Sequence, residues 1–104
     1  MIVVYIACTS EEEARNISRG LLERRLIACA NIFPVKSMYW WKGAVEESNE
    51  HIIIAKTVSE NFESVKKEVI SLHSYEVPLI ECWNVDEISD DYLKYLNEEV
   101  NKDG

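Results

Sequence analysis

The stretch IACANIFPVKSMYWW, residues 27–41, has the β-branched and aromatic composition of one long β-strand, bent at Pro34. Lys42-Gly43 then supplies a turn, and HIIIAKT, residues 51–57, brings the chain back. At about 3.3 Å per residue, a strand of some fourteen residues reaches roughly 45 Å, about twice the length of a seven-residue strand. The sequence therefore predicts a β-hairpin that projects past its own sheet.

The arms of this hairpin carry apolar side chains on both faces. Tyr39 and Trp41 point to one face and Met38 and Trp40 to the other, because side chains alternate along a strand. The isoleucines of residues 51–57 alternate in the same way in the return arm. A ribbon apolar on both faces would aggregate in a monomer, so we expect it to be buried against sister subunits. A stacking platform for a ligand is the alternative role of these aromatic rings.

Helix and strand signals on either side of the hairpin complete the pattern. Ser10 with Glu13 fits a capping box, and apolar residues then recur at helical spacing to about Arg25. Ser59 begins a second helix and Ser89 caps a closing one. The expected order is strand 2–8, helix 10–25, strand 27–41, strand 51–57, a helix from 59, a strand after 78 and a helix from 89. This is the α+β, ferredoxin-like split βαβ arrangement with an added carboxy-terminal helix, and it leaves one face of the sheet for a partner to cover.

Length, charge and cysteine content narrow the class of protein. A chain of 104 residues, 47% of them hydrophobic, has enough material for one modest core, so we expect a single domain over residues 1–104. A formal net charge of −8 argues against a nucleic-acid partner, because such binding draws on Lys and Arg. The opening MIVVYIACTSEEE matches neither a secretory signal nor a membrane span. Three cysteines are an odd number at wide spacings, so they cannot complete a disulfide framework and they suit a reducing compartment. The sequence therefore predicts a cytoplasmic protein.

A cysteine and a histidine are expected at the same end of the subunit. In the split βαβ arrangement the first strand and the second helix run in the same direction, so Cys8 and His73 lie at neighbouring carboxyl ends. Cys29 starts a strand at the opposite end. Thiolate and imidazole together suit copper and zinc, and Glu76, in the loop after His73, can add an oxygen ligand or orient the ring. The sequence therefore predicts a metal site of Cys8, His73 and Glu76.

The cysteines and the histidine also have a purely structural interpretation. Cysteine is among the most buried residue types, so Cys8, Cys29 and Cys82 are equally candidates for the core. His73 continues the apolar side of the second helix and stands in its last turn, where the helix dipole favours a cation. For each of these residues, a role as a metal ligand and a purely structural role both remain possible from the sequence.

The remaining acidic residues and the other histidine are given no site. Residues 11–13 are interpreted as a favourable first helical turn and not as a metal cluster. Glu46, Glu47 and Glu50 are interpreted as solvated residues after the hairpin tip, and His51 has no assigned role.

Catalytic motifs are absent from the sequence. It contains no glycine-rich phosphate loop and no GxSxG elbow. Cys8 with His73 is a conceivable thiolate and base pair, but nothing indicates an oxyanion hole beside it. We therefore interpret the chain as a protein that is not an enzyme.

Five motifs occur in an order and spacing that resemble one known family. They are ACANIFP (28–34), SMYWWKG (37–43), Lys56-Thr57, HSYEVP (73–78) and DYLKYLNEE (91–99). On these motifs the sequence resembles the CutA family, which is linked to divalent-cation tolerance. The resemblance implies a compact homotrimer, similar in architecture to the PII signalling proteins, that binds copper or another divalent cation such as zinc. Ser74 departs from the family pattern, in which proline usually follows the histidine, and this loosens the preset turn.

Two classes of function stay open at this point. The first is a trimeric metal-binding protein involved in the response to metal ions. The second is a PII-like sensor or scaffold, whose intersubunit clefts take a small ligand or a protein partner.

Overall fold

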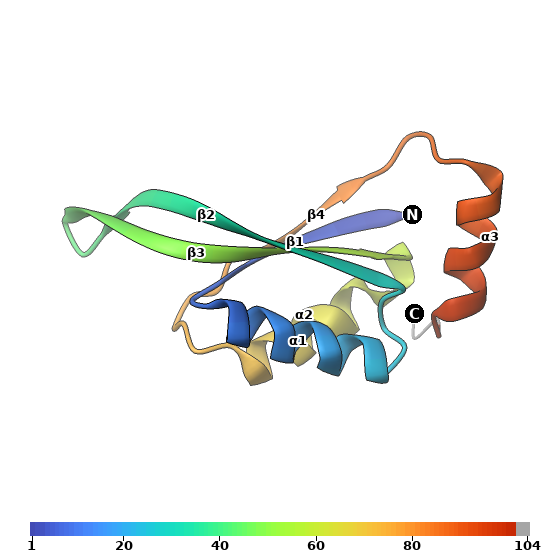
Figure 1. Ribbon diagram of the computed structural model, residues 1–104, viewed down its shortest axis with the longest axis horizontal. Coiled ribbons are helices and arrows are strands. Elements are labelled where there is room, and N and C mark those ends of the chain that lie inside the picture. The colour runs from blue at the N-terminus through green and yellow to red at the C-terminus, as the bar shows by residue number, and fades with distance from the viewer. Residues whose placement is uncertain (102–104) are drawn as a thin grey trace.

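The described part of the chain, residues 1–101 of a computed structural model, forms one layer of sheet and one layer of helices (Figure 1). The elements are β1 (Ile2–Cys8), α1 (Glu11–Glu23), β2 (Cys29–Trp41), β3 (Ala44–Thr57), a 3-10 turn (Ser59–Asn61), α2 (Phe62–Leu72), β4 (Ile80–Asn84) and α3 (Asp90–Glu99). This order confirms the ferredoxin-like α+β arrangement expected from the sequence.

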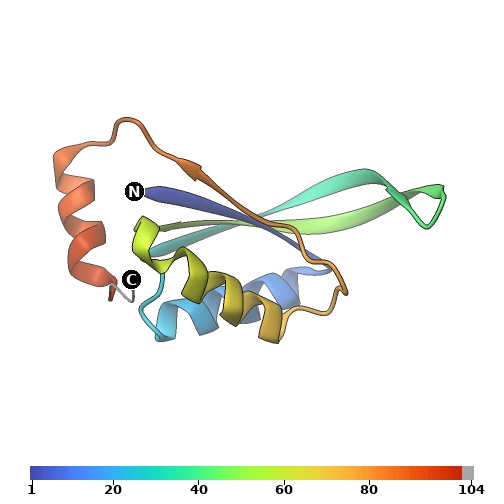
Figure 2. The same cartoon turned by 180° about the vertical axis from the view of Figure 1, so that it is seen from behind.

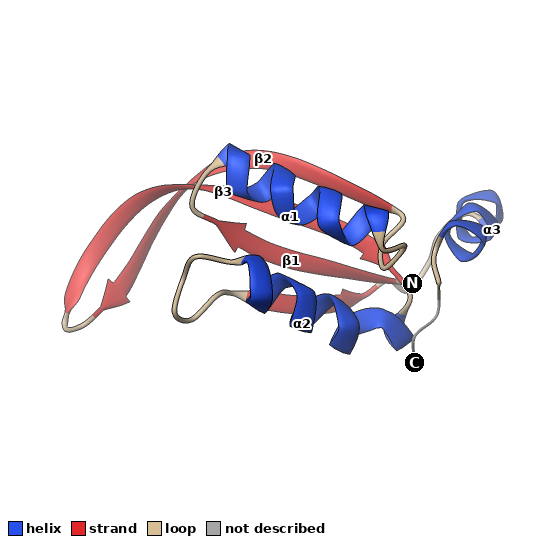
Figure 3. Cartoon of the chain, turned by 90° about the horizontal axis from the view of Figure 1, so that it is seen from below, coloured by secondary structure: helices blue, strands red, loops and turns tan. Residues whose placement is uncertain are grey.

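The sheet has four antiparallel strands in the order β2-β3-β1-β4. Helices α1 and α2 lie next to each other on one of its faces (Figure 3) and leave the other face uncovered (Figure 1). Helix α3 stands beyond the end of the sheet that is farthest from the hairpin tip (Figures 1 and 2). None of the described helices is both long and apolar enough to cross a membrane.

The core lies between the sheet and the two helices, and strict alternation along β1 and β3 builds it. Val4 and Ile6 of β1 pair with Ala55 and Ile53 of β3, and all four side chains are buried on the helix-facing side. The helices add their own apolar stripes, Ala14, Ile17 and Leu21 from α1 and Val65 and Val69 from α2. Cys8 ends the β1 row and is fully buried.

The helix ends follow the sequence signals only in part. Ser10 caps α1, because its hydroxyl oxygen accepts the Glu13 N–H at 3.1 Å. Ser89 occupies the N-cap of α3 but makes no side-chain capping bond to the described residues, and Ser59 starts a 3-10 turn instead of α2 itself. Leu96 of α3 and Val100, the C-cap residue of that helix, pack inward against Val58.

The hairpin β2–β3 is longer than its sheet. Its pairing continues from Cys29↔Lys56 to Trp41↔Ala44, whereas β1 pairs with β3 only as far as Cys8↔His51. Beyond that pair the two arms project alone and give the molecule its longest dimension of 45 Å (Figure 1). Lys42 and Gly43 both have positive φ, 50° and 82°, as the tightest right-twisted hairpin turns require.

The projecting return arm is not apolar as expected. Strand β3 begins at Ala44, so its isoleucines lie beside β1 within the sheet, and the projecting part is the segment 44–50, which is polar from Glu46 onward. Opposite it, Met38 and Trp40 keep 67% and 75% of their surface exposed. The projection therefore has one aromatic arm and one largely acidic arm, and its exposed apolar surface lies mainly on the aromatic arm.

The three cysteines separate by burial. Cys8 is buried, Cys29 is half-buried and Cys82 is exposed. The core interpretation therefore holds for Cys8 and is wrong for Cys82 in the single chain, because β4 is an edge strand that the helices cover incompletely.

Candidate metal centre

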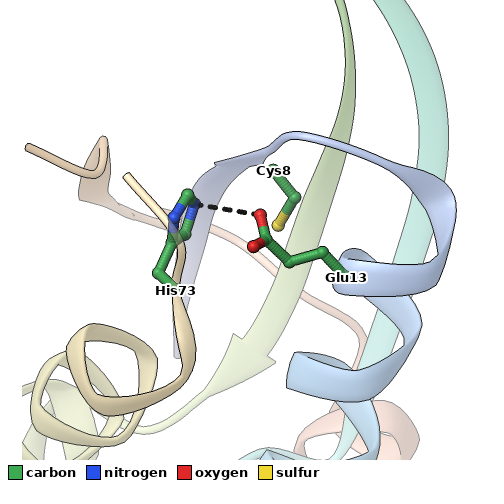
Figure 4. A group of neighbouring side chains, drawn as sticks. All are labelled: Cys8, Glu13 and His73. Atoms are coloured by element: carbon green, nitrogen blue, oxygen red, sulfur yellow. Dashed lines mark ion pairs between the residues drawn. The ribbon is translucent and has the colours of Figure 1, made fainter. Parts of the chain in front are cut away.

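Three potential metal ligands converge where β1 ends. The thiol sulfur of Cys8, a carboxylate oxygen of Glu13 and a ring nitrogen of His73 all lie within 4.8 Å of one another (Figure 4). They come from the last residue of β1, the first turn of α1 and the first residue after α2. The structure thus brings Cys8 and His73 together, as expected from the direction of their elements, and adds a glutamate that was not expected.

His73 is held by the backbone on both sides of its ring. It follows the end of α2 with an extended backbone, φ −82° and ψ 145°, so it lies just past the last turn in which the sequence placed it. Its Nδ1 accepts the Tyr75 N–H at 3.0 Å, so the ring proton resides on Nε2, which donates to the Ala7 carbonyl oxygen at 2.6 Å. The side chain is fully buried. These contacts fix the orientation of the imidazole ring at the end of α2.

Glu13 bridges three segments of the chain. Its Oε1 accepts the N–H and the hydroxyl of Thr9 at 2.9 Å and 3.2 Å, and its Oε2 accepts the Ser74 N–H at 3.1 Å. Oε1 also lies 3.7 Å from His73 Nε2. Interpreting Glu13 only as a helix-turn residue was therefore incomplete. The capping-box pattern contained the missing signal, because the third residue of such a helix folds its side chain back over the preceding residues, which here adjoin Cys8.

The charge of Glu13 is stabilised where it stands. Burial alone raises the pKa of this carboxyl, but the hydrogen bonds from Ser74 and Thr9 and the nearness of His73 outweigh burial, so the pKa is lowered overall. A carboxyl whose pKa is lower in the folded than in the unfolded chain stabilises the fold at pH values above its unfolded-state pKa. This stabilisation is lost as the pH falls through the folded-state pKa.

Cys8 has the opposite character. Burial, reinforced by the negative charges of Glu13 and Glu50, raises the pKa of its thiol to about 12. At neutral pH the group is therefore a protonated thiol, whereas reactive cysteines have lowered pKa values. Only a bound cation would favour the thiolate here. This chemistry fits a metal ligand better than a catalytic nucleophile.

Glu76, the third ligand proposed from the sequence, lies apart from this cluster. Its side chain is exposed in the loop between α2 and β4, and it is not among the converging ligand atoms of the described residues. Glu13 takes the corresponding place. The loop approaches the sheet through Tyr75 instead, whose hydroxyl donates to Glu50 Oε2 at 2.8 Å.

Glu50 differs most from the interpretation made from sequence. Only 6% of its surface is exposed, so it is not a solvated residue after the hairpin tip. Burial first, and then the hydrogen bond to Glu50, raise the pKa of Tyr75, so its hydroxyl remains a proton donor at all ordinary pH values. Tyr75 thereby connects His73 on one side of the loop to the root of the hairpin on the other.

A hollow of about 580 Å³ opens between the loop and the hairpin. Its walls are mainly apolar and include Tyr39, Trp41 and Leu79, with the Glu50–Tyr75 pair among its polar groups. Ala7 also lines it, and the carbonyl of this residue accepts the His73 ring proton. The hollow and the metal-ligand cluster are therefore neighbours on opposite sides of the end of β1.

The donor set fits a borderline divalent metal. Zinc binds thiolate at about 2.3 Å and imidazole or carboxylate at about 2.0 to 2.2 Å, so ligand atoms on one ion are about 3.5 Å apart. To close the present separations of up to 4.8 Å around an ion, the side chains must shift and one His73 ring nitrogen must exchange its backbone hydrogen bond for the metal. Glu13 Oε2 keeps a lone pair beyond the one that accepts the Ser74 N–H, whereas both lone pairs of Oε1 accept from Thr9.

The fold and this cluster together define a class of protein: small ferredoxin-like subunits with a buried thiol, imidazole and carboxylate at one end of the sheet. Comparison with known proteins gives the class a name. The profile of the CutA1 divalent ion tolerance protein family matches residues 2–99, and the chain belongs to this family. The divalent-cation tolerance protein CutA of Pyrococcus horikoshii is 42% identical over 102 residues, covering 98% of this chain and 100% of the relative. That of Archaeoglobus fulgidus is 42% identical over 97 residues, covering 93% and 95%.

Solved structures agree with this assignment. A crystal structure of CutA1 from Pyrococcus horikoshii superposes with a TM-score of 0.94 at 41% identity, covering 98% of this chain and 100% of that one. The PII-like protein CutA from Nostoc superposes with a TM-score of 0.91 at 29% identity, covering 98% and 99%. The resemblance found in the sequence motifs is thereby confirmed across nearly the whole chain.

Ser74 provides a test of how the cluster is held. Replacing it by proline removes the N–H that Glu13 Oε2 accepts, so we expect Ser74→Pro to raise the pKa of Glu13. Ser74→Ala keeps the N–H and loses only the hydroxyl, so it should raise the pKa less. Carboxyl chemical shifts of Glu13 followed against pH by NMR measure both variants beside the parent. If proline leaves this pKa where alanine does, the backbone N–H does not hold the carboxylate.

Proposed function

We propose that this chain is a single-domain subunit of a homotrimer that binds copper, or zinc, and takes part in the cell's response to divalent metal ions. The convergence of Cys8, Glu13 and His73 at the end of β1 carries the proposal. Membership of a divalent ion tolerance family supports it. Sulfur and nitrogen ligands select copper and zinc over magnesium and calcium, which prefer oxygen ligands.

The same features speak for a binding role over a catalytic one, and for the cytoplasm. The Cys8 thiol is protonated at neutral pH, so it lacks the activation of a nucleophile. Three cysteines without a disulfide suit a reducing compartment. The Archaeoglobus fulgidus structure is described as that of a periplasmic protein, whereas the three free cysteines lead us to propose the cytoplasm for this chain. A net charge of −8 continues to argue against nucleic acid as a partner.

Three subunits are proposed because two apolar surfaces of the chain are uncovered. The helix-free face of the sheet carries the stacked rings of Tyr5 and Trp83, with centroids 5.5 Å apart, and 47% of Trp83 is exposed. The aromatic arm of the hairpin is the second surface. Large aromatic side chains left exposed together are typical of interfaces. The family resemblance supports three subunits over two.

A second candidate function rests on the hollow beside Tyr75. A largely apolar recess with a few polar groups is the usual form of a small-ligand site. Tyr75 borders this recess and also bonds His73, so occupation of either site can affect the other. A PII-like sensor that takes a small ligand or partner next to the metal is therefore the alternative, and the Nostoc protein is itself described as PII-like.

The ligand assignment predicts a pattern among variants. Cys8→Ala, His73→Ala and Glu13→Gln should each weaken zinc or copper binding by at least about tenfold, as loss of a group at a metal site usually does. Glu76→Gln serves as the matched control, because Glu76 is acidic and near in sequence but exposed and outside the cluster. Isothermal titration under reducing conditions gives the affinities. Binding by His73→Ala equal to that of the parent would place the site elsewhere.

The raised pKa of Cys8 predicts how affinity depends on pH. The free thiol, with a pKa of about 12, is protonated throughout pH 6 to 8, so metal binding must release its proton. Zinc affinity should therefore rise about tenfold for each pH unit across this range. Competition against a chelator of known pH dependence measures the slope. Cys8→Ala should bind zinc weakly and should lack the part of the pH dependence that comes from release of the thiol proton. If the affinity of the parent protein does not rise with pH in this way, Cys8 is not a ligand.

The trimer is tested by mass and by one aromatic residue. Light scattering at micromolar concentration should give three times the 12.1 kDa of the chain. Trp41→Ala should promote dissociation on dilution, because it removes an aromatic side chain from the surface that we assign to the interface. Ile70→Ala, on the outer side of α2 with 55% of its surface exposed, is the control and should leave the trimer intact. A monomer mass for the parent would refute the assembly.

A further inference from the structure

His51 lies beside the metal-ligand cluster although the sequence gave no reason to place it there. In the antiparallel pair β1–β3, His51 stands directly opposite Cys8. Opposite residues of such a pair project to the same face of the sheet. The preceding pairs, Ile6 with Ile53 and Val4 with Ala55, are buried on the helix-facing side. Cys8 and His51 continue this row, so both side chains belong to the side where the cluster lies.

The Nδ1 atom of His51 is buried and unsatisfied. It makes no hydrogen bond to any of the described residues. A buried ring nitrogen without a partner is unfavourable, and native structures rarely keep one without a reason. His73 shows the contrast, because both nitrogens of its ring are bonded to backbone groups. His51 therefore offers a free nitrogen on the side of the sheet that carries the Cys8 thiol.

The spacing of the two strands suits a shared metal ion. Directly opposite residues have Cβ atoms about 4.5 to 5.5 Å apart. A metal at about 2.3 Å from the sulfur of one and about 2.0 Å from the Nδ1 of the other fits between two such residues, because Nδ1 is the ring nitrogen closer to Cβ. The His51 nitrogens are not yet within 4.8 Å of all three cluster atoms, so the ring must turn about its side-chain torsions to reach the ion.

We propose that His51 is the fourth protein ligand of the metal, bound through Nδ1 and completing a Cys, Glu, His, His set. This inference rests on the proposed metal-binding function. Four protein ligands close a tetrahedral site, and closed sites hold metal without an open position for a reacting molecule. A closed site of this kind stores or senses the ion and does not catalyse with it.

The experiment detects His51 directly in the parent protein. The chain is labelled with ¹⁵N at histidine and titrated with Zn²⁺ alone, under reducing conditions. We expect the Nδ1 resonance of His51 and a ring-nitrogen resonance of His73 to move to metal-bound positions together, at one equivalent of zinc per subunit. This measurement needs no substitution, so it does not depend on whether a variant folds.

Two variants then measure what His51 contributes. His51→Phe keeps a flat ring in the strand and removes the nitrogen, so zinc affinity should fall at least about tenfold. Asn49→Ala is the matched control: it lies two residues earlier on the same side of β3, is exposed and should bind like the parent. Thermal melting and light scattering check that both variants keep the fold and the assembly.

The outcomes separate this inference from the proposed function. If the His73 resonance moves while that of His51 does not, His51 is not a ligand and the three-residue site stands. If His51→Phe binds zinc more weakly although the His51 resonance of the parent protein does not move, the substitution disturbs packing. That result also overturns the inference. If no histidine resonance moves and zinc does not bind, the proposed function fails and the fourth ligand fails with it.

Discussion

The register of β1 against β3 is the constraint on which the rest of the structure depends. Val4 and Ile6 face Ala55 and Ile53 across this central pair, and together they present the buried surface that α1 and α2 cover. A slip by one residue would turn this whole row to the uncovered face of the sheet. The same register sets Cys8 opposite His51 at the end of the row. Core packing and the position of the candidate metal ligands are therefore decided by one strand pairing.

Glu13 joins that pairing to the helix layer. Its backbone N–H is capped by Ser10, and its carboxylate accepts hydrogen bonds from Thr9 before the helix and from Ser74 after α2. One side chain thus ties the start of α1 to the loop that carries His73. The hydrogen bonds that hold it also keep it ionised, which a cation ligand requires. Local helix capping and ligand geometry are two consequences of the same contacts.

Tyr75 makes the loop after α2 a link between two surfaces. Its backbone N–H bonds the His73 ring, while its hydroxyl bonds the buried Glu50 at the root of the hairpin. A metal that takes a ring nitrogen of His73 competes with the present bonds of that ring. A change in the hydrogen bonds of His73 can shift Tyr75, which lines the apolar hollow together with residues of the aromatic arm. Metal binding and a PII-like response are therefore compatible roles for one subunit.

The sequence alone determined the element order, the long hairpin and the meeting of Cys8 with His73, because strand alternation, helix caps and chain direction are local or topological properties. It misjudged the return arm, since the largely polar segment 44–50 extends the strand by pairing with the aromatic arm. Only the tertiary structure decided that Glu13, not Glu76, joins the cluster, that Glu50 is buried and that His51 faces Cys8. These facts depend on where a loop folds back and on which register two distant strands adopt. Residue types by themselves specify neither, because burial and proximity are properties of the packed chain.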